Sequence, residues 1–161
     1  METHLEIVGK LHEAFKSKGL RLSIAESCTG GLISHWLTTL PGASLFFDSS
    51  IVSYSINSKI KLLGVKKSTV KKHGTISEET AREMAESLRS KTGTDFCLSI
   101  TGNLGPEPIE DKKVGLVFIA VSFSKETTSR GFRFEGSRDK IKKSAGITAL
   151  EFLYEAVSIW T

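Results

Sequence analysis

One short segment limits the folds that this chain can adopt. It is an apolar stretch followed directly by hydroxyl-bearing residues and two glycines. The segment is RLSIAESCTGG, residues 21–31, and Arg21 to Glu26 have the composition of a short buried strand. Apolar residues then recur at helical spacing, which predicts a helix from Thr29 to about Thr39. The segment is therefore predicted to form a strand, a tight turn and the start of a helix.

The turn places hydroxyl groups beside the first backbone N–H groups of that helix. These N–H groups have no intrahelical acceptor and carry the positive end of the helix dipole, so they suit an anion or an oxyanion. Two interpretations are open on this segment alone. Either Ser27 or Thr29 caps the helix, or the turn holds a nucleophile or an anion cradle.

Size and charge narrow the classes of function. The chain of 161 residues is the size of one domain, which we place at 1–161. The net charge of +4 suits a small anionic ligand but is too weak and dispersed to indicate nucleic acid. No apolar run approaches the roughly 20 residues that cross a bilayer, and the N-terminus lacks the apolar core of a signal peptide. We therefore expect a cytoplasmic protein without a membrane partner.

The cysteines and histidines do not have the spacing of metal ligands. Cys28 lies in the turn and Cys97 in an apolar strand, which favours two reduced thiols over a disulfide. His4 and His12 lack acidic or cysteine companions at ligand spacing, so we interpret both as ordinary helix residues. We predict no metal site.

The order of elements predicts the fold class. Helices are predicted at 4–18, 29–39, 57–63 and 66–73, between Ser77 and Gly93, and from Ser137 to Trp160, and strands at 21–26, 45–55, 95–101, 114–123 and 128–135. Helices alternating with strands, followed by two consecutive strands, indicate a single three-layer α/β/α domain with a mixed, mostly parallel sheet. Ligands of such sheets bind at loops beyond the strand carboxyl ends, where the 27–31 turn and the 101–106 loop both lie.

The sequence offers few ways to activate a serine. The phosphate-binding patterns GxxxxGK[ST] and GxGxxG are absent, which disfavours an NTPase or a dinucleotide enzyme. A lysine can take the proton of a serine if burial or nearby positive charge lowers its pKa. Lys59, just beyond Tyr54 and Ser55, can reach the mouth of the site, but spacing alone does not single it out.

Short motifs in a fixed order run along nearly the whole chain. They are AESCTGG at 25–31, VSYSINSK at 52–59, LLGV at 62–65, HGTISEE at 73–79, SITGNLGP at 99–106, VG at 114–115 and FEGSRDKIKKSA at 134–145. Together they resemble the nicotinamide mononucleotide amidohydrolases, which are also the C-terminal domain of the competence-damage protein CinA. Several motifs in one order are more specific than any single one.

The resemblance implies hydrolysis of the carboxamide of nicotinamide mononucleotide to nicotinate mononucleotide and ammonia. It implies no metal and no cofactor, a small-molecule nucleotide as the partner, and a homo-oligomer. Ser27 would be the nucleophile, Lys59 its general base, and Tyr54 a supporting hydroxyl near this pair.

The same resemblance implies the residues that bind the substrate. Backbone amides after Ser27 would form an oxyanion hole, in the run Cys28, Thr29, Gly30 and Gly31. Thr101 and Gly102 would lie against the ligand. Arg138 would meet the substrate phosphate or order the site, because a guanidinium binds phosphate oxygens bidentately; the alternative is a salt bridge at a helix start.

Two departures from the family pattern leave a second interpretation open. Ile56 stands where the family has Asn after the Tyr-Ser pair, and Glu107-Pro108-Ile109 replace a longer, glycine-rich loop. The second interpretation is a catalytically weak nucleotide-binding or regulatory module. Cys28 is a competing nucleophile, since a helix N-terminus lowers a thiol pKa, but we expect it to pack inward.

Overall fold

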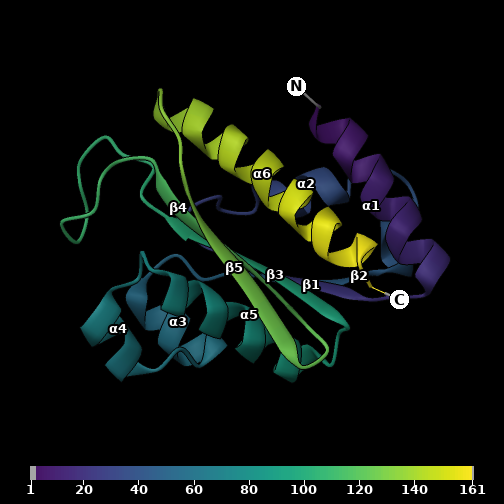
Figure 1. The fold of residues 1–161 in the computed structure, drawn as a ribbon, viewed down its shortest axis with the longest axis horizontal. Helices are drawn as coiled ribbons and strands as arrows, with labels where there is room; N and C mark the ends of the chain where they lie inside the picture. The colour runs from purple at the N-terminus through teal and green to yellow at the C-terminus, as the bar shows by residue number, and fades with distance from the viewer. Residues whose placement is uncertain (1–2, 161) are drawn as a thin grey trace.

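Helices cover both faces of a central sheet in the computed structural model, which describes residues 3–160 (Figure 1). The helices are α1 (His4–Lys18), α2 (Leu32–Leu37), α3 (Ile56–Leu63), α4 (Lys67–His73), α5 (Glu78–Thr92) and α6 (Arg138–Ser158), with a short 3₁₀ helix, η1 (Ala43–Leu45). The strands are β1 (Leu22–Glu26), β2 (Phe47–Val52), β3 (Phe96–Gly102), β4 (Leu116–Phe123) and β5 (Glu126–Arg133). The predicted α/β class is confirmed.

The five strands form one mixed sheet in the order β2-β1-β3-β4-β5. Strand β1 pairs in parallel with both β2 and β3, whereas β4 is antiparallel to β3 and to β5. Glu26 at the end of β1 is in register with Val52 of β2 and Ile100 of β3. The chain segments that leave these three strands therefore start from one edge of the sheet.

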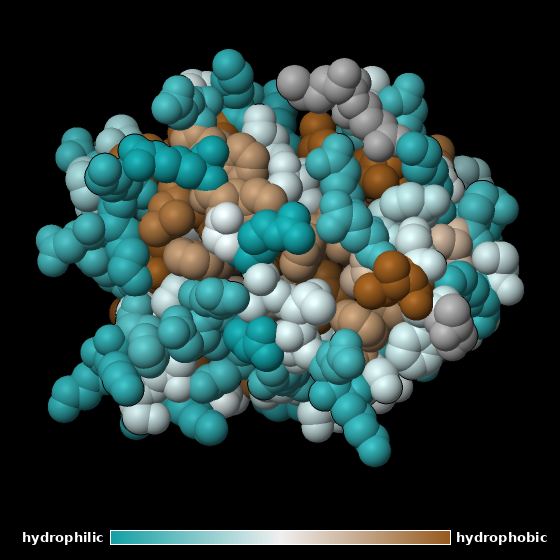
Figure 2. Space-filling model, in the orientation of Figure 1, coloured by the Kyte–Doolittle hydropathy of each residue, from teal (hydrophilic) through white to brown (hydrophobic). Residues whose placement is uncertain are grey.

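The core has two parts, one on each face of the sheet. Strand side chains alternate between the faces, so Ile24 packs with α1, α2 and α6, while Ala25 packs with α5. Strand β1, LSIAE, is buried on both faces, and its polar Ser23 and Glu26 are buried along with the apolar residues. On the face shown in Figure 2, apolar side chains gather in a band over β5 and α6. The ring of Phe132 on β5 meets the ring of Phe152 on α6 edge to face.

Most predicted bounds differ from the structure by one or two residues, and three elements differ by more or for a clear physical reason. The helix expected at 29–39 is only Leu32–Leu37, because Gly30 and Gly31 have φ of 60° and 101°, outside the helical region. The strand expected at 45–55 is β2, Phe47–Val52, preceded by η1. The strand expected at 128–135 begins earlier, at Glu126, because a tight turn at Ser124 and Lys125 joins it directly to β4.

Candidate active site

A buried lysine and a serine are joined at the end of the parallel strands. The Lys59 ammonium donates to Ser27 Oγ at 2.7 Å and to the Ser53 carbonyl oxygen at 2.7 Å. Ser27 directly follows β1, and Lys59 lies on α3 just after β2, so two neighbouring parallel strands bring them together. Lys59 is 2% exposed and Ser27 7%. The lysine that the sequence left as one choice among several therefore contacts the predicted nucleophile.

Burial sets the protonation of this lysine. It lowers the pKa of Lys59 from 10.5 to about 8, against the opposing influence of Cys28 and Glu110. A substantial fraction of Lys59 is then the free amine just above neutral pH. A free amine at 2.7 Å from a serine hydroxyl is placed to accept its proton.

The N-terminus of α2 holds an anion that belongs to the chain itself. The Glu26 carboxylate accepts from the backbone N–H groups of Gly31, Ile33 and Ser34. It also accepts from the Thr29 hydroxyl at 2.6 Å. The residue at the N-cap position is Gly31, which makes no side-chain cap. Glu26 therefore occupies the place expected for a capping hydroxyl or a bound anion, and the interpretation of the turn as the site of a nucleophile stays a prediction.

Two backbone amides in the turn remain available. The Gly30 N–H bonds to the Ser27 carbonyl oxygen. Within residues 3–160, the N–H groups of Cys28 and Thr29 have no acceptor. They follow Ser27 directly. Of the backbone amides predicted to form an oxyanion hole, those of Gly30 and Gly31 therefore have internal partners.

Cys28 packs inward, as expected. It is 6% exposed, and burial raises the pKa of its thiol to about 12, with Lys59 acting in the opposite direction. Desolvation therefore outweighs the neighbouring groups that lower the pKa of this thiol. The thiol stays protonated at neutral pH, so Ser27 is the better-placed nucleophile.

A cavity of about 280 Å³ opens over the Ser27–Lys59 pair. The predicted site residues that line it are Ser27, Cys28, Tyr54, Lys59, Thr101, Gly102 and Arg138. Thr29, Gly30 and Gly31 lie outside its lining, and Thr29 instead holds Glu26. This volume is near the lower end of ligand cavities, about 300 Å³, so the cavity suits a small ligand.

Arg138 and Tyr54 form one wall of this cavity. Arg138 Nη2 donates to the Tyr54 hydroxyl at 2.9 Å, and Nη1 donates to the Gly105 carbonyl oxygen. In the part of the chain that the structure describes, Arg138 pairs with no carboxylate, so the alternative of a salt bridge is not found. The Tyr54 hydroxyl thus bonds to Arg138, while the Tyr54 carbonyl oxygen accepts from Lys59 at 3.3 Å.

Gly102 is required by close packing of the sheet. A Cβ on this residue would lie 2.7 Å from Val117 Cγ2 and 2.8 Å from the Leu116 carbonyl oxygen on β4. Its neighbour Thr101 donates its hydroxyl to the Thr75 carbonyl oxygen at 2.9 Å. Both residues therefore also fix the cavity wall.

Sequence reasoning missed the other side of the cavity. Thr75, Ile76 and Glu110 line it, although they come from the connection between α4 and α5 and from the loop before β4. The segment 107–113, EPIEDKK, has the polar composition of a surface segment, and nothing in it distinguishes Glu110 from its neighbours. Only the fold brings that loop against residues 75–76.

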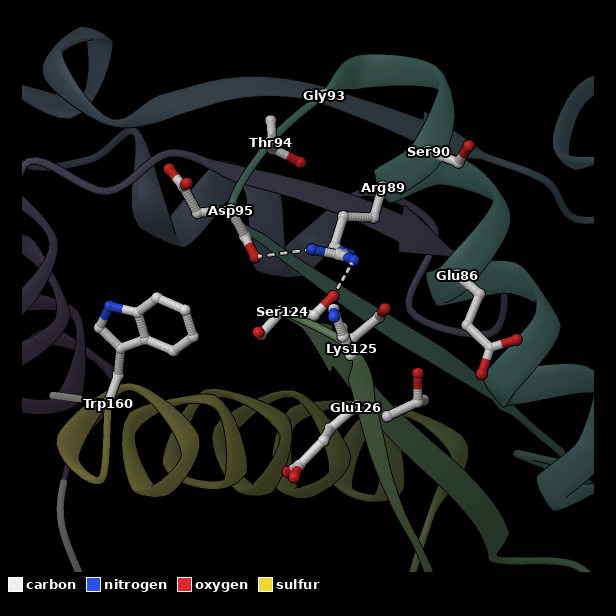
Figure 3. A pocket seen from close by; sticks show the side chains of 12 residues that line it. Glu86, Arg89, Ser90, Gly93, Thr94, Asp95, Ser124, Lys125, Glu126 and Trp160 are labelled. Carbon is white, nitrogen blue, oxygen red and sulfur yellow. Dashed lines mark hydrogen bonds between the residues drawn. The ribbon is translucent and has the colours of Figure 1, made fainter.

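A larger cavity, of about 530 Å³, lies at the opposite end of the sheet (Figure 3). It lies between the end of α5, the β4–β5 turn and Trp160 near the C-terminus. The guanidinium of Arg89 points into the middle of this region and donates to the carbonyl oxygens of Asp95 and Ser124. This arginine therefore stabilises the backbone, and the candidate chemistry lies in the smaller cavity.

The described residues contain neither a metal-binding cluster nor a membrane-spanning helix. Across residues 3–160, the structure contains no cluster of three or more His, Cys, Asp or Glu side chains that could bind a metal ion. His12 is buried and its Nε2 pairs with the Leu37 carbonyl oxygen at 2.8 Å, and His4 stacks on Trp36, so both act as ordinary helix residues. Within the same residues, no helix is long and apolar enough to cross a membrane.

Comparisons with known proteins agree over most of the chain. The CinA C-terminal domain family matches residues 4–157. A CinA-like protein of Endomicrobium trichonymphae is 47% identical over 133 residues, which are 82% of this chain and 31% of that protein. A CinA-like protein of Dictyoglomus thermophilum is 43% identical over 153 residues, 94% of this chain and 37% of that protein. The chain thus spans about a third of the length of these curated relatives.

Solved structures show the same fold. The competence or damage-inducible protein of Enterobacter asburiae superposes with a TM-score of 0.95 at 34% identity, covering 98% of this chain and 99% of that one. The competence damage-inducible protein A of Klebsiella pneumoniae superposes with a TM-score of 0.97 at 29% identity, covering 99% and 100%. The described sheet and helices are therefore those of solved relatives.

Proposed function

Because this chain belongs to the CinA C-terminal domain family, we propose that it hydrolyses the carboxamide of nicotinamide mononucleotide to nicotinate mononucleotide and ammonia. The observation that carries the proposal is the 2.7 Å contact between the buried Lys59 amine and Ser27 Oγ. A nucleophile with a base in hydrogen-bond contact is the arrangement that acyl transfer requires.

In the proposed reaction, Lys59 takes the proton from Ser27 Oγ as this oxygen attacks the carboxamide carbon. Lys59 Nζ then gives this proton to the amide nitrogen of the substrate. The C–N bond breaks, and the nitrogen leaves as ammonia. Water, deprotonated by the same lysine, attacks the resulting ester. This second step releases the carboxylate and restores the Ser27 hydroxyl.

The negative charge that develops on the carbonyl oxygen needs donors. The N–H groups of Cys28 and Thr29 are the amides after Ser27 that lack an acceptor within residues 3–160, so we assign them this role. The substrate phosphate is assigned to Arg138, whose guanidinium lines the cavity. Binding energy from the phosphate, which is remote from the amide, can then orient the carbonyl against Ser27.

The test is ammonia release by the purified protein in the presence of a chelator. We expect turnover of nicotinamide mononucleotide, with a lower kcat/KM for free nicotinamide, which lacks the phosphate. Ser27→Ala should abolish ammonia release and retain ligand affinity, because only the chemical step is removed. Ligand binding by calorimetry without ammonia above the blank would refute the proposal and favour the catalytically weak binding module.

A further inference from the structure

In the loop before β4, Glu110 has a left-handed backbone conformation that a glutamate rarely adopts. Ile109 and Lys112 form an isolated antiparallel bridge, and the Lys112 N–H bonds to the Ile109 carbonyl oxygen at 2.9 Å. Between them, Glu110 and Asp111 have φ of 55° and 57°. Such a turn usually takes glycine or asparagine, and a glutamate with positive φ persists only where its surroundings stabilise it.

Those surroundings are the residues just before α5. The Glu110 carboxylate accepts from the Thr75 N–H at 2.8 Å, from the Thr75 hydroxyl at 2.5 Å and from the Ile76 N–H at 3.1 Å. Gly74 is needed beside it, because a Cβ there would collide with the carboxylate. Lys112 fixes the other side of the turn by donating to the His73 and Ile76 carbonyl oxygens.

These contacts keep Glu110 ionised while it lines the cavity. Partial burial raises the pKa of Glu110, but the hydrogen bonds from Thr75 and Ile76 outweigh it, and the net effect lowers this pKa. Glu110 lines the same cavity as Ser27 and Arg138. The cavity therefore carries a fixed negative charge as well as the positive charge of Arg138.

The proposed substrate carries two opposite charges. Its pyridine ring is cationic because the ring nitrogen is bonded to the ribose, and its phosphate is anionic. Resting on the proposed function, we propose that Glu110 is a specificity-determining residue that recognises the cationic ring, opposite in charge to the Arg138 that meets the phosphate. Glu110 then favours cationic ring amides over neutral ones of the same shape.

Two ligands that differ in ring charge test this role. Nicotinamide mononucleotide has a cationic ring, and its dihydro form has a neutral one with the same phosphate and carboxamide. Affinities are measured by calorimetry in a Ser27→Ala background, so that turnover does not interfere. We expect the cationic ligand to bind about fivefold to tenfold more tightly, the order expected for one partly exposed charge pair.

Glu110→Gln keeps the shape and an oxygen acceptor for residues 75–76, and it should bring this ratio to about one. Glu107→Gln is the matched control, because Glu107 lies in the same loop and does not line the cavity; it should leave the ratio unchanged. An equal loss of affinity for both ligands in Glu110→Gln would assign Glu110 a structural role and overturn the inference. The inference would also be overturned if the Ser27→Ala protein bound both ligands equally well, or bound neither.

The charge preference and the proposed hydrolysis are decided by separate measurements. Ammonia release by the wild-type protein decides that reaction, whereas the charge preference is read from binding without turnover. A protein that shows the preference but releases no ammonia would retain the inference and lose the proposed activity.

Discussion

Replacing Lys59 by Met should remove catalysis without unfolding the protein. A buried methionine preserves most of the side-chain volume but cannot accept the Ser27 proton. Because nucleophile and base act as a unit, we expect kcat to fall by about 10³-fold or more. The double variant with Ser27→Ala should lose little beyond either single change.

The effect of Lys59→Met on stability follows from its pKa. Lowering this pKa from 10.5 to about 8 means that the native state binds the Lys59 proton more weakly than the unfolded chain. The contribution of Lys59 to the free energy of unfolding therefore rises as the pH increases from about 8 to 10.5. Below pH 8, the buried ammonium lowers the free energy of unfolding by about 3 kcal/mol. Methionine removes that cost but loses three hydrogen bonds worth about 1 kcal/mol each.

We therefore expect the free energy of unfolding of Lys59→Met at pH 7 to stay within about 1 kcal/mol of the wild type, from urea titrations. Ammonia release from nicotinamide mononucleotide is the activity assay. Lys61→Met is the control, since Lys61 is exposed on the same helix. Activity above about a tenth of the wild type in Lys59→Met, or an equal loss in Lys61→Met, would refute the assignment of the base.

Two further predictions concern pH and the helix start. The kcat/KM should rise with pH through about 8, because the Lys59 amine must lose its proton before it can accept one; a flat profile from pH 6 to 9 would contradict this. Glu26→Gln should lower the free energy of unfolding by about 2 to 4 kcal/mol in urea titrations, since it removes a buried, charge-assisted set of hydrogen bonds. The exposed Glu13→Gln should change it by less than about 0.5 kcal/mol, and equal effects would contradict the role of Glu26.

The fold could be predicted from the sequence where local signals agree. Helix α1 matches its predicted bounds, His4–Lys18, because a capping box at Thr3 and a left-handed Gly19 define both ends. Ser77 and Ser137 cap α5 and α6 as expected. The bounds near 30 and 46 were missed because glycine conformations and η1 depend on how the chain leaves the sheet.

The site was only partly predictable for a related reason. Ser27 and Lys59 lie in family motifs, but Lys59 by sequence alone resembles its exposed neighbour Lys61, and only burial distinguishes them. Glu26 was interpreted as the end of a strand, although its side chain turns back onto the next helix. Glu110 lies 34 residues from Ile76 in sequence, so their contact is set by tertiary structure.

In the proposed reaction, Ser27 forms a covalent bond to the carboxamide carbon, with Lys59 as its base. Hydroxylamine intercepts such an ester, so the measurement is the division of products when nicotinamide mononucleotide reacts in rising hydroxylamine concentrations. We expect the wild type to form hydroxamate at the expense of nicotinate mononucleotide, and Ser27→Ala to form none. Nicotinate mononucleotide alone at every concentration, or hydroxamate persisting in Ser27→Ala, would contradict it.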